Sequence, residues 1–263
     1  MNREQRLSAL NAELAKRILV LDGSMGAYLQ GFGLQAEDFH GERFADHRMS
    51  LKGDTDVLTL TRPEVIVKVH DAYLEAGADI VSTNTFTATP ISQAEYGLEA
   101  HGREMNVDRA RLAREACQRP AEGAKPRAVA GSVGPTTKLL SMSPDVGDPG
   151  RRDATFDTMA AGYKEQILGL IEGGADLLLI ETITDTLNAK SALWAAWEAF
   201  DETGVELPLW ISGTITDKSG RTLSGQTVEA FYNSVRHANP WAVGLNCALG
   251  PQDMRAFLAD LSR

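Results

Sequence analysis

Cys247 is the residue of this chain whose chemistry is easiest to place. It directly follows the apolar run 241–246, so a strand there leaves the thiol at its carboxyl end. A cysteine in such a position is most often a small packed hydrophobe, whereas a metal site needs two or three further ligands. Cys117 falls in the helical stretch 106–118, and the sequence has no CxxC or HExxH motif. The residues alone therefore leave a packing cysteine and a metal ligand as open alternatives.

Polar side chains also stand at the ends of the other apolar runs, and two of them are carboxylates. Asp22 and Glu181 suit a ligand that carries an ammonium group, because carboxylates pair with cations. The same pair suits general acid–base catalysis. Loops are polar in any case, so each residue taken alone also has a purely structural explanation. The polar residues predicted at strand ends are Asp22, Thr83, Asn84, Thr85, Ser132, Glu181, Thr182, Ser212, Thr214, Asn246 and Cys247.

Near-continuous apolar runs must position these side chains. Such runs, separated by amphipathic stretches, are typical of parallel strands covered by helices. The segment 22–26 (DGSMG) lacks the spacing of a dinucleotide-binding turn, so a β/α barrel is favoured over a doubly wound sheet. Helical patterns cover about 63–76, 156–171 and 187–200. The predicted strands are 18–22, 78–83, 127–133, 175–181, 207–214 and 241–247.

A β/α barrel brings the carboxyl ends of its eight strands to one active-site face. We therefore predict an α/β fold, a (β/α)8 TIM-type barrel with about six of its eight strands present, parallel and in sequential order. Residues 1–17 are expected to form an N-terminal helix that caps the barrel, and residues 18–263 the barrel itself, incomplete at its C-terminus. The side chains expected near one another at its mouth are Asp22, Asn84, Ser132, Glu181 and Cys247.

Composition narrows the class of protein. A net charge of −10 disfavours nucleic-acid binding, which needs a basic surface, and also disfavours anionic membranes. No apolar run approaches the ~18 residues of a membrane span, and the charged N-terminus does not resemble a secretory signal. Two cysteines without a short-range framework indicate a reducing compartment. We expect a cytoplasmic enzyme without nucleic-acid or membrane partners.

Two long segments, 135–157 and 213–227, are expected to form loops at the barrel mouth, and loops of this length are usually functional or disordered. Lys138 and Lys218 lie in them, outside any apolar run that would depress the pKa of a lysine. Schiff-base chemistry is therefore disfavoured. The five histidines are scattered, and none has the spacing of a metal ligand.

Seven phrases of the sequence resemble the cobalamin-dependent methionine synthase family, and the match runs from about Arg17 to the last residue. Related enzymes that use betaine or S-methylmethionine share the Asp22–Gly23 pair, Glu181 and Cys247, but not the long 213–227 loop. The phrases are LDGSMGAYLQ (21–30), GERFADH (41–47), STNTF (82–86), GPTTKLLSMSPDVGDP (134–149), IETITDTLNAK (180–190), SGTITDKSGRTLSGQT (212–227) and GLNCALGP (244–251).

The resemblance implies a zinc- and homocysteine-binding site at the barrel mouth. In the family three cysteines hold zinc, and the homocysteine thiol becomes the fourth ligand; Cys247 matches the first of the three. The other two form a GGCCG-like phrase at the end of strand eight, which this sequence lacks. Ser82 stands where the family commonly has a glutamate, so no role for that acid is carried over. The predicted substrate-binding residues are Asp22, Ser132, Glu181 and Asn246.

The implied function is methyl transfer to homocysteine, which gives methionine. Zinc deprotonates the bound thiol, and the donor is methylcobalamin, whose methyl group comes from 5-methyltetrahydrofolate. The cobalamin and methyl-folate modules lie downstream in the family and are absent here. We expect this chain alone to be inactive, to bind zinc weakly, and to associate through the open edges of strands one and six. The alternatives are a stand-alone homocysteine S-methyltransferase that uses betaine or S-methylmethionine, and a non-catalytic truncated remnant.

Overall fold

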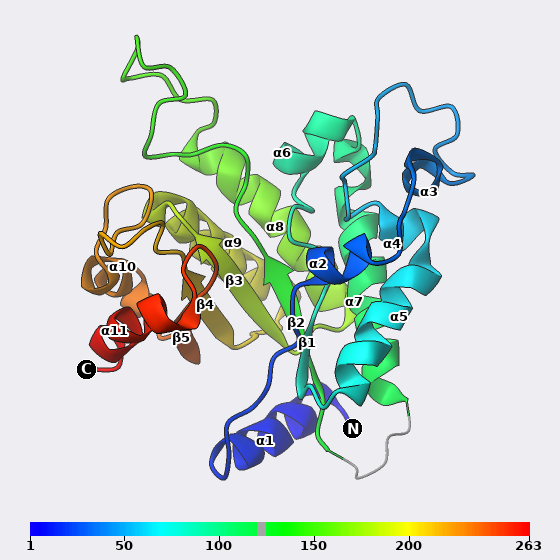
Figure 1. Ribbon diagram of the computed structural model, residues 1–263, viewed down its shortest axis with the longest axis horizontal. Helices are drawn as coiled ribbons and strands as arrows, with labels where there is room; N and C mark the ends of the chain where they lie inside the picture. The colour runs from blue at the N-terminus through cyan, green and yellow to red at the C-terminus, as the bar shows by residue number, and fades with distance from the viewer. Residues whose placement is uncertain (120–124) are drawn as a thin grey trace.

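Five parallel strands form one sheet in the computed structural model, which describes residues 1–119 and 125–263. Each strand pairs with the next along the chain, and helices lie in every connection (Figure 1). The predicted α/β fold, with a parallel sheet in sequential order, is confirmed for these strands. They are β1 (Ile80–Ser82), β2 (Ala128–Val133), β3 (Leu177–Ile183), β4 (Leu209–Gly213) and β5 (Ala242–Leu245).

The first apolar run, 18–22, makes a single parallel bridge, between Leu21 and Ile80, where a full strand was predicted. The Asp22 N–H donates to the Ile80 carbonyl at 2.9 Å, which places Asp22 beside β1. Ile18 is 87% exposed, whereas Leu19 and Leu21 pack against the inner cluster, so only part of the run is held against the sheet. The prediction was therefore right about the place of this run and wrong about its extent.

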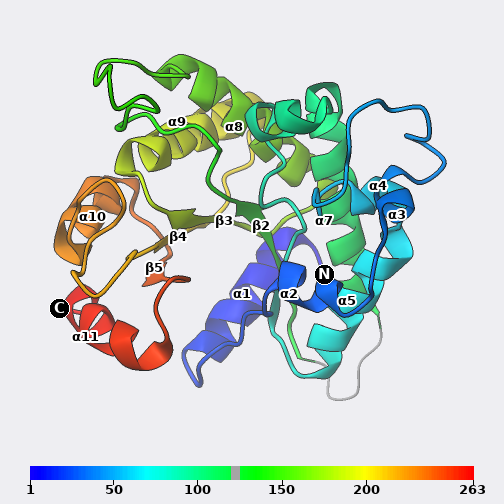
Figure 2. The same cartoon turned by 45° about the horizontal axis from the view of Figure 1, so that its top comes forward.

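Most of the helices surround the outside of the curved sheet, whereas the N-terminal helix lies on its inner side (Figure 2). Along the chain α7, α8, α9, α10 and α11 each pack against the next, and the three predicted helices are observed as α5, α8 and α9. Among the described residues no helix is both long and apolar enough to cross a membrane. The helices are α1 (Arg3–Leu14), α2 (Met25–Gln30), α3 (Ala36–His40), α4 (Leu58–Thr61), α5 (Pro63–Glu75), α6 (Pro90–Gln93), α7 (Gly102–Gln118), α8 (Phe156–Gly173), α9 (Thr186–Thr203), α10 (Val228–Val235) and α11 (Pro251–Leu261), with short 3-10 turns η1 (Ala94–Tyr96), η2 (Glu99–His101) and η3 (Arg236–Ala238).

Two of these helices end in the same way before a strand, as their similar sequences predict. Gly77 after α5 has φ 105°, and Gly174 after α8 has φ 98°. Glycine adopts this left-handed conformation without a steric penalty, and so it ends a helix sharply. At the other end of α8, the Thr155 hydroxyl accepts from the Thr158 N–H at 3.2 Å in a capping box. These local signals fix where β1 and β3 begin.

The two faces of the sheet bury different apolar clusters. Leu178 and Ile180 of β3 pack in the large cluster that includes the inner sides of α7, α8 and α9. Leu177 and Leu179 pack on the opposite face, in a smaller cluster that includes Leu10 of α1. This alternation follows from the two-residue period of a strand. The second face is the interior of the barrel segment.

Helix α1 covers the amino ends of the strands. The Arg3 Nε donates to the Ala175 carbonyl at 2.9 Å, and Arg6 pairs at 2.8 Å with Asp176, whose side chain is fully buried. At the far side of the sheet, β5 pairs with β4 alone, and within the described chain it does not reach the β1 edge. The strands therefore form an open segment of a barrel.

Candidate active site

The end of β3 carries an irregularity that turns two polar side chains away from the helices. β3 and β4 pair evenly up to Ile180, and pairing resumes with a shifted register at Ile183. Between them Thr182 has φ 58°, a left-handed conformation that a β-branched residue rarely adopts. Ile180 and Ile183 both pack in the helix-facing core. The extra residue of this bulge leaves Glu181 and Thr182 together on the inner side.

Glu181 is held by its neighbour on β2. The Ser132 hydroxyl donates to Glu181 Oε1 at 2.6 Å, and Ser132 itself is buried. Burial raises the pKa of Glu181, because a carboxylate loses hydration there, while hydrogen bonds from Ser132 and Thr182 oppose the rise. Two predicted site residues are thus in direct contact. The arrangement favours a cationic partner that would compensate the buried charge.

Asp22 occupies the corresponding place beside β1. Its two carboxylate oxygens accept from Ser82, one from the N–H and one from the hydroxyl, each at 2.9 Å. Burial raises the pKa of Asp22 to about 7, and the nearby charge of Glu181 adds to the rise. The two carboxylates therefore lie within electrostatic reach of each other. Ser82, which replaces a common glutamate of the family resembled above, here orients Asp22.

Asn246 and Cys247 follow β5 directly. The Asn246 amide contacts Thr182 and Ser212, and its Nδ2 lies 3.1 Å from Cys247 Sγ. Cys247 is exposed and has φ 61°, so its thiol lies at the carboxyl end of the sheet as predicted. Cys117 instead is buried on α7 and packs in the helix-facing core, as its sequence context predicts.

Buried polar side chains hold the segment between β1 and α6 in place by hydrogen bonds. Asp56 and Gln166 among them were not selected from the sequence. Asp56 accepts from the Thr87 N–H at 3.1 Å, and Gln166 Nε2 donates to the Thr85 carbonyl at 2.7 Å. Asn84, predicted at the mouth, is 4% exposed and donates to the Thr55 carbonyl at 2.7 Å. Its amide therefore fixes this segment to the preceding loop.

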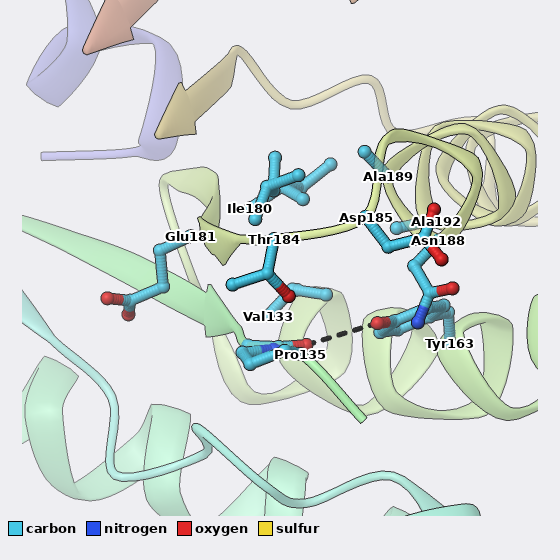
Figure 3. A pocket seen from close by; sticks show the side chains of 12 residues that line it. Val133, Pro135, Tyr163, Ile180, Glu181, Thr184, Asp185, Asn188, Ala189 and Ala192 are labelled. Carbon is cyan, nitrogen blue, oxygen red and sulfur yellow. Dashed lines mark hydrogen bonds between the residues drawn. The ribbon is translucent and has the colours of Figure 1, made fainter. Parts of the chain in front are cut away.

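A small cavity of about 10 Å³, room for roughly one water molecule, lies on the helix side of the β3 end. Figure 3 shows Tyr163 and Asn188 on this side, while the Glu181 carboxylate points away from them. The Tyr163 hydroxyl donates to the Gly134 carbonyl at 3.2 Å. Asn188 and Asp185, at the start of α9, accept from N–H groups of residues 140 and 141. They anchor the first part of the predicted 135–157 loop, a role that no sequence motif signalled.

The metal-binding capacity of the site is limited by its ligands. Across residues 1–119 and 125–263, no three His, Cys, Asp or Glu side chains are grouped so that they could hold a metal ion. A catalytic zinc site takes three protein ligands and keeps one position open. The described residues therefore do not form a zinc site on their own.

The family of the chain follows from comparison with known proteins. A family model, Homocysteine S-methyltransferase, matches residues 19–263. The chain belongs to this family. The matched range contains the whole sheet and every residue of the site, and the reaction type of the family is transfer of a methyl group to homocysteine. The chain is thus assigned to the methyltransferases by most of its length.

Solved homocysteine methyltransferases have a similar structure. The metallated form of the homocysteine methyltransferase MmuM from Escherichia coli has a TM-score of 0.70 and 25% sequence identity, over 96% of this chain and 82% of that one. The apo form of the same enzyme gives a TM-score of 0.63 and 24% identity, over 96% and 81% of the two chains. The fold is thus that of the homocysteine methyltransferase barrel, with the barrel left open after β5.

Proposed function

We propose that this chain is the homocysteine-binding barrel of a cobalamin-dependent methionine synthase. The observation that carries the proposal is the pair of carboxylates Asp22 and Glu181, at the same end of the sheet as Cys247. Each carboxylate accepts hydrogen bonds from serine, and each has its pKa raised by burial. An amino acid with an ammonium group at one end and a thiol at the other matches such a site.

The carboxylates would bind the ammonium group of homocysteine. A cation between Asp22 and Glu181 relieves their mutual repulsion and compensates their lost hydration. Ser132 occupies one oxygen of Glu181 and so directs the other toward the ligand. The predicted fourth substrate residue, Asn246, already makes bonds to protein partners, so it would contact the substrate only by giving one of them up.

Zinc belongs to the proposal as the partner of Cys247. The structural relative MmuM has a metallated form, and an exposed thiol at the mouth is the ligand type that zinc prefers. When bound, zinc would supply a deprotonated homocysteine thiol at neutral pH. Because Cys247 is one ligand of the three required, two further thiolates must join it before such chemistry operates.

The choice of methyl donor rests on different observations. The phrase at 212–227 supports methylcobalamin, since the related enzymes that use betaine or S-methylmethionine lack that loop. The similarity to MmuM, of which the chain covers 82%, supports the alternative of a stand-alone homocysteine S-methyltransferase. Methionine formation in the presence of methylcobalamin, betaine or S-methylmethionine, with the chain extended by a family segment that carries the GGCCG-like phrase, decides between them. Binding without transfer from any donor would support the non-catalytic remnant.

Calorimetry with homocysteine tests the substrate site. Glu181→Gln keeps the shape and removes the charge, and should weaken binding by roughly 1–3 kcal/mol, the range for a hydrogen bond to a charged group. Glu75→Gln, at an exposed residue on the amino side of the sheet, is the matched control. 4-Mercaptobutyrate, which lacks the amino group, should bind the parent chain and Glu181→Gln equally. An unchanged affinity for homocysteine in Glu181→Gln would remove this residue from the site.

A further inference from the structure

The Asn246 side chain has every hydrogen-bonding position occupied by protein atoms. Its Oδ1 accepts from the Ser212 hydroxyl at 2.7 Å and from the Thr182 N–H at 3.2 Å. Its Nδ2 donates to the Thr182 hydroxyl at 2.8 Å and to Cys247 Sγ at 3.1 Å. A primary amide offers two donors and two principal acceptor positions. A side chain bonded in this way is suited to hold other groups in place.

The orientation of this amide is settled by chemistry. Oxygen and nitrogen of an asparagine are exchanged easily when a structure is built, so the hydrogen-bond network must decide. The Thr182 backbone N–H can only donate, and therefore the atom that faces it must be Oδ1. The Ser212 hydroxyl donates to the same oxygen. Nδ2 is then directed at the Thr182 hydroxyl and at the Cys247 sulfur, which accepts.

Thr182 reaches Asn246 because of its unusual backbone. With φ 58°, it offers both its N–H and its hydroxyl to the single amide of Asn246, which directly follows β5, two strands away in the sheet. The same hydroxyl group is near enough to Glu181 to lower the pKa of that carboxyl by hydrogen bonding. A regular strand would point residue 182 at the helices and would break this connection.

We propose that Thr182 is a positioning residue, which fixes the Asn246 amide so that its Nδ2 holds the Cys247 sulfur in the barrel mouth. Asn246, predicted as a substrate ligand, then serves to present the thiol. These hydrogen bonds are needed because Cys247 is exposed and the β5 residues before it are only partly buried. Packing leaves the thiol free to rotate, and the hydrogen bonds restrict it.

The conformation of the Cys247 side chain measures this effect directly. Three-bond couplings between its α and β protons report whether χ1 occupies one rotamer or averages over several. In the parent chain we expect one rotamer. Thr182→Val removes the hydroxyl at nearly constant shape and should average the couplings, whereas Thr182→Ser keeps the hydroxyl and should restore the parent pattern. Thr184→Val, two residues along and facing the helix-side cavity, is the matched control and should leave Cys247 unchanged (Figure 3).

A second variant covers the case in which Thr182→Val does not fold. Asn246→Asp keeps the oxygen that accepts from Thr182 and Ser212 and loses both N–H donors, so it should also free Cys247. A single rotamer in folded Thr182→Val or in Asn246→Asp overturns the proposal, as does averaging in the parent chain. If the hydrogen bonds between Thr182 and Asn246 only stabilised the fold, Thr182→Val would lower the midpoint of thermal unfolding and leave the Cys247 couplings unchanged. The measurement needs neither homocysteine nor metal, so its failure is distinguishable from failure of the proposed function.

Discussion

The central strands and the last strand of the sheet differ sharply in burial. Every residue of β2 is buried, and so is most of β3, whereas all four residues of β5 are partly exposed. The flanking helices follow the same division. Helix α8 buries one whole side against the sheet and α7, while no residue of α11 is fully buried. Strands with the same apolar sequence character thus end up in different environments, because burial depends on neighbours on both sides.

The site residues are divided between these two regions. Ser132 and Glu181 stand on the buried strands, where packing restricts their movement, and Cys247 follows the strand with the least support. The hydrogen bonds from Asn246 to Thr182 connect the two regions directly. Packing therefore supports the strands that carry Ser132 and Glu181, whereas the thiol side is connected to them by hydrogen bonds.

Matched leucine truncations should show the largest difference between the two regions. Leu170 of α8 is fully buried, and Leu258 of α11 is 42% exposed. Leu170→Ala should lower the free energy of unfolding by about 2–5 kcal/mol, since it leaves a cavity. Leu258→Ala makes the same change in a helix and should stay within about 0.5 kcal/mol. Urea denaturation measures both, and equal losses would mean that α11 is as well packed as α8.

Asp22, which lies beside the edge strand β1, gives a second test. Its buried carboxylate should make the stability of the chain depend on pH. Its pKa is about 7 in the folded chain, against 3.8 for an ordinary aspartate. The folded state therefore keeps a proton that the unfolded state releases, and the free energy of unfolding should fall as pH rises from about 4 to about 7. Asp22→Asn should remove its share of this fall and leave the chain relatively more stable at pH 8 than the parent.

A control with the opposite sign is available on the surface. Hydrogen bonds from Ser219 lower the pKa of Asp217, which lies in the loop after β4. Asp217→Asn should therefore act only in acid, below the usual range of an aspartate, and should leave the slope between pH 4 and pH 7 as it is. Denaturation curves at several pH values test this, and identical slopes in the parent and Asp22→Asn would contradict the raised pKa of Asp22.

The central strands were predicted well from the sequence, because local runs of apolar residues determine where they form. The run 127–133 became Ala128–Val133, and the run 175–181 became Leu177–Ile183. The run 18–22 has the same pattern but stands at an edge, so it forms one bridge instead of a strand. The pattern of apolar residues identifies the candidate strands. The extent of their strand pairing depends on whether neighbouring elements cover them.

The site was predictable only in part for a related reason. Strand-end position and chemical type were enough to select Glu181 and Cys247, which the structure places at the carboxyl ends of β3 and β5. The role of Thr182 depends on a left-handed backbone, which the amino-acid type of a β-branched residue argues against. Its partner Asn246 comes from 64 residues farther along the chain. Contacts of this kind arise from tertiary structure, and a single sequence does not contain a local signal for them.

The N-cap of α8 tests the well-packed central region, and the effect expected there is intermediate in size. Thr155 forms the N-cap, and its hydroxyl accepts from the Thr158 N–H at 3.2 Å. Thr155→Ala should lower the free energy of unfolding by about 1 kcal/mol, because one helix N–H loses its acceptor. Thr155→Ser keeps the acceptor and is the control. Thermal unfolding should show a drop in the midpoint for alanine alone; a drop of the same size for serine would assign the effect to the lost methyl group.

The smallest effect is expected where α11 begins, and here a substitution should improve the molecule. Gly250 is the N-cap of α11 and offers no side-chain acceptor, unlike Thr155. Its φ of −72° and ψ of 165° suit any residue, and an added Cβ would meet no atom within 4 Å. Gly250→Asp should therefore stabilise α11 by a few tenths of a kcal/mol, through a capping bond and a favourable charge at the helix N-terminus.

Hydrogen exchange detects this gain better than global unfolding, because a weakly packed helix opens locally before the rest of the chain. Amides in α11 should exchange more slowly in Gly250→Asp, and amides in α8 should be unchanged. Gly250→Ala adds a Cβ without an acceptor, and its α11 amides should exchange faster than those of the aspartate variant. Equal protection in the two variants would show that the N-terminus of α11 already has its acceptors. The missing cap would then play no part in the weak support of this region.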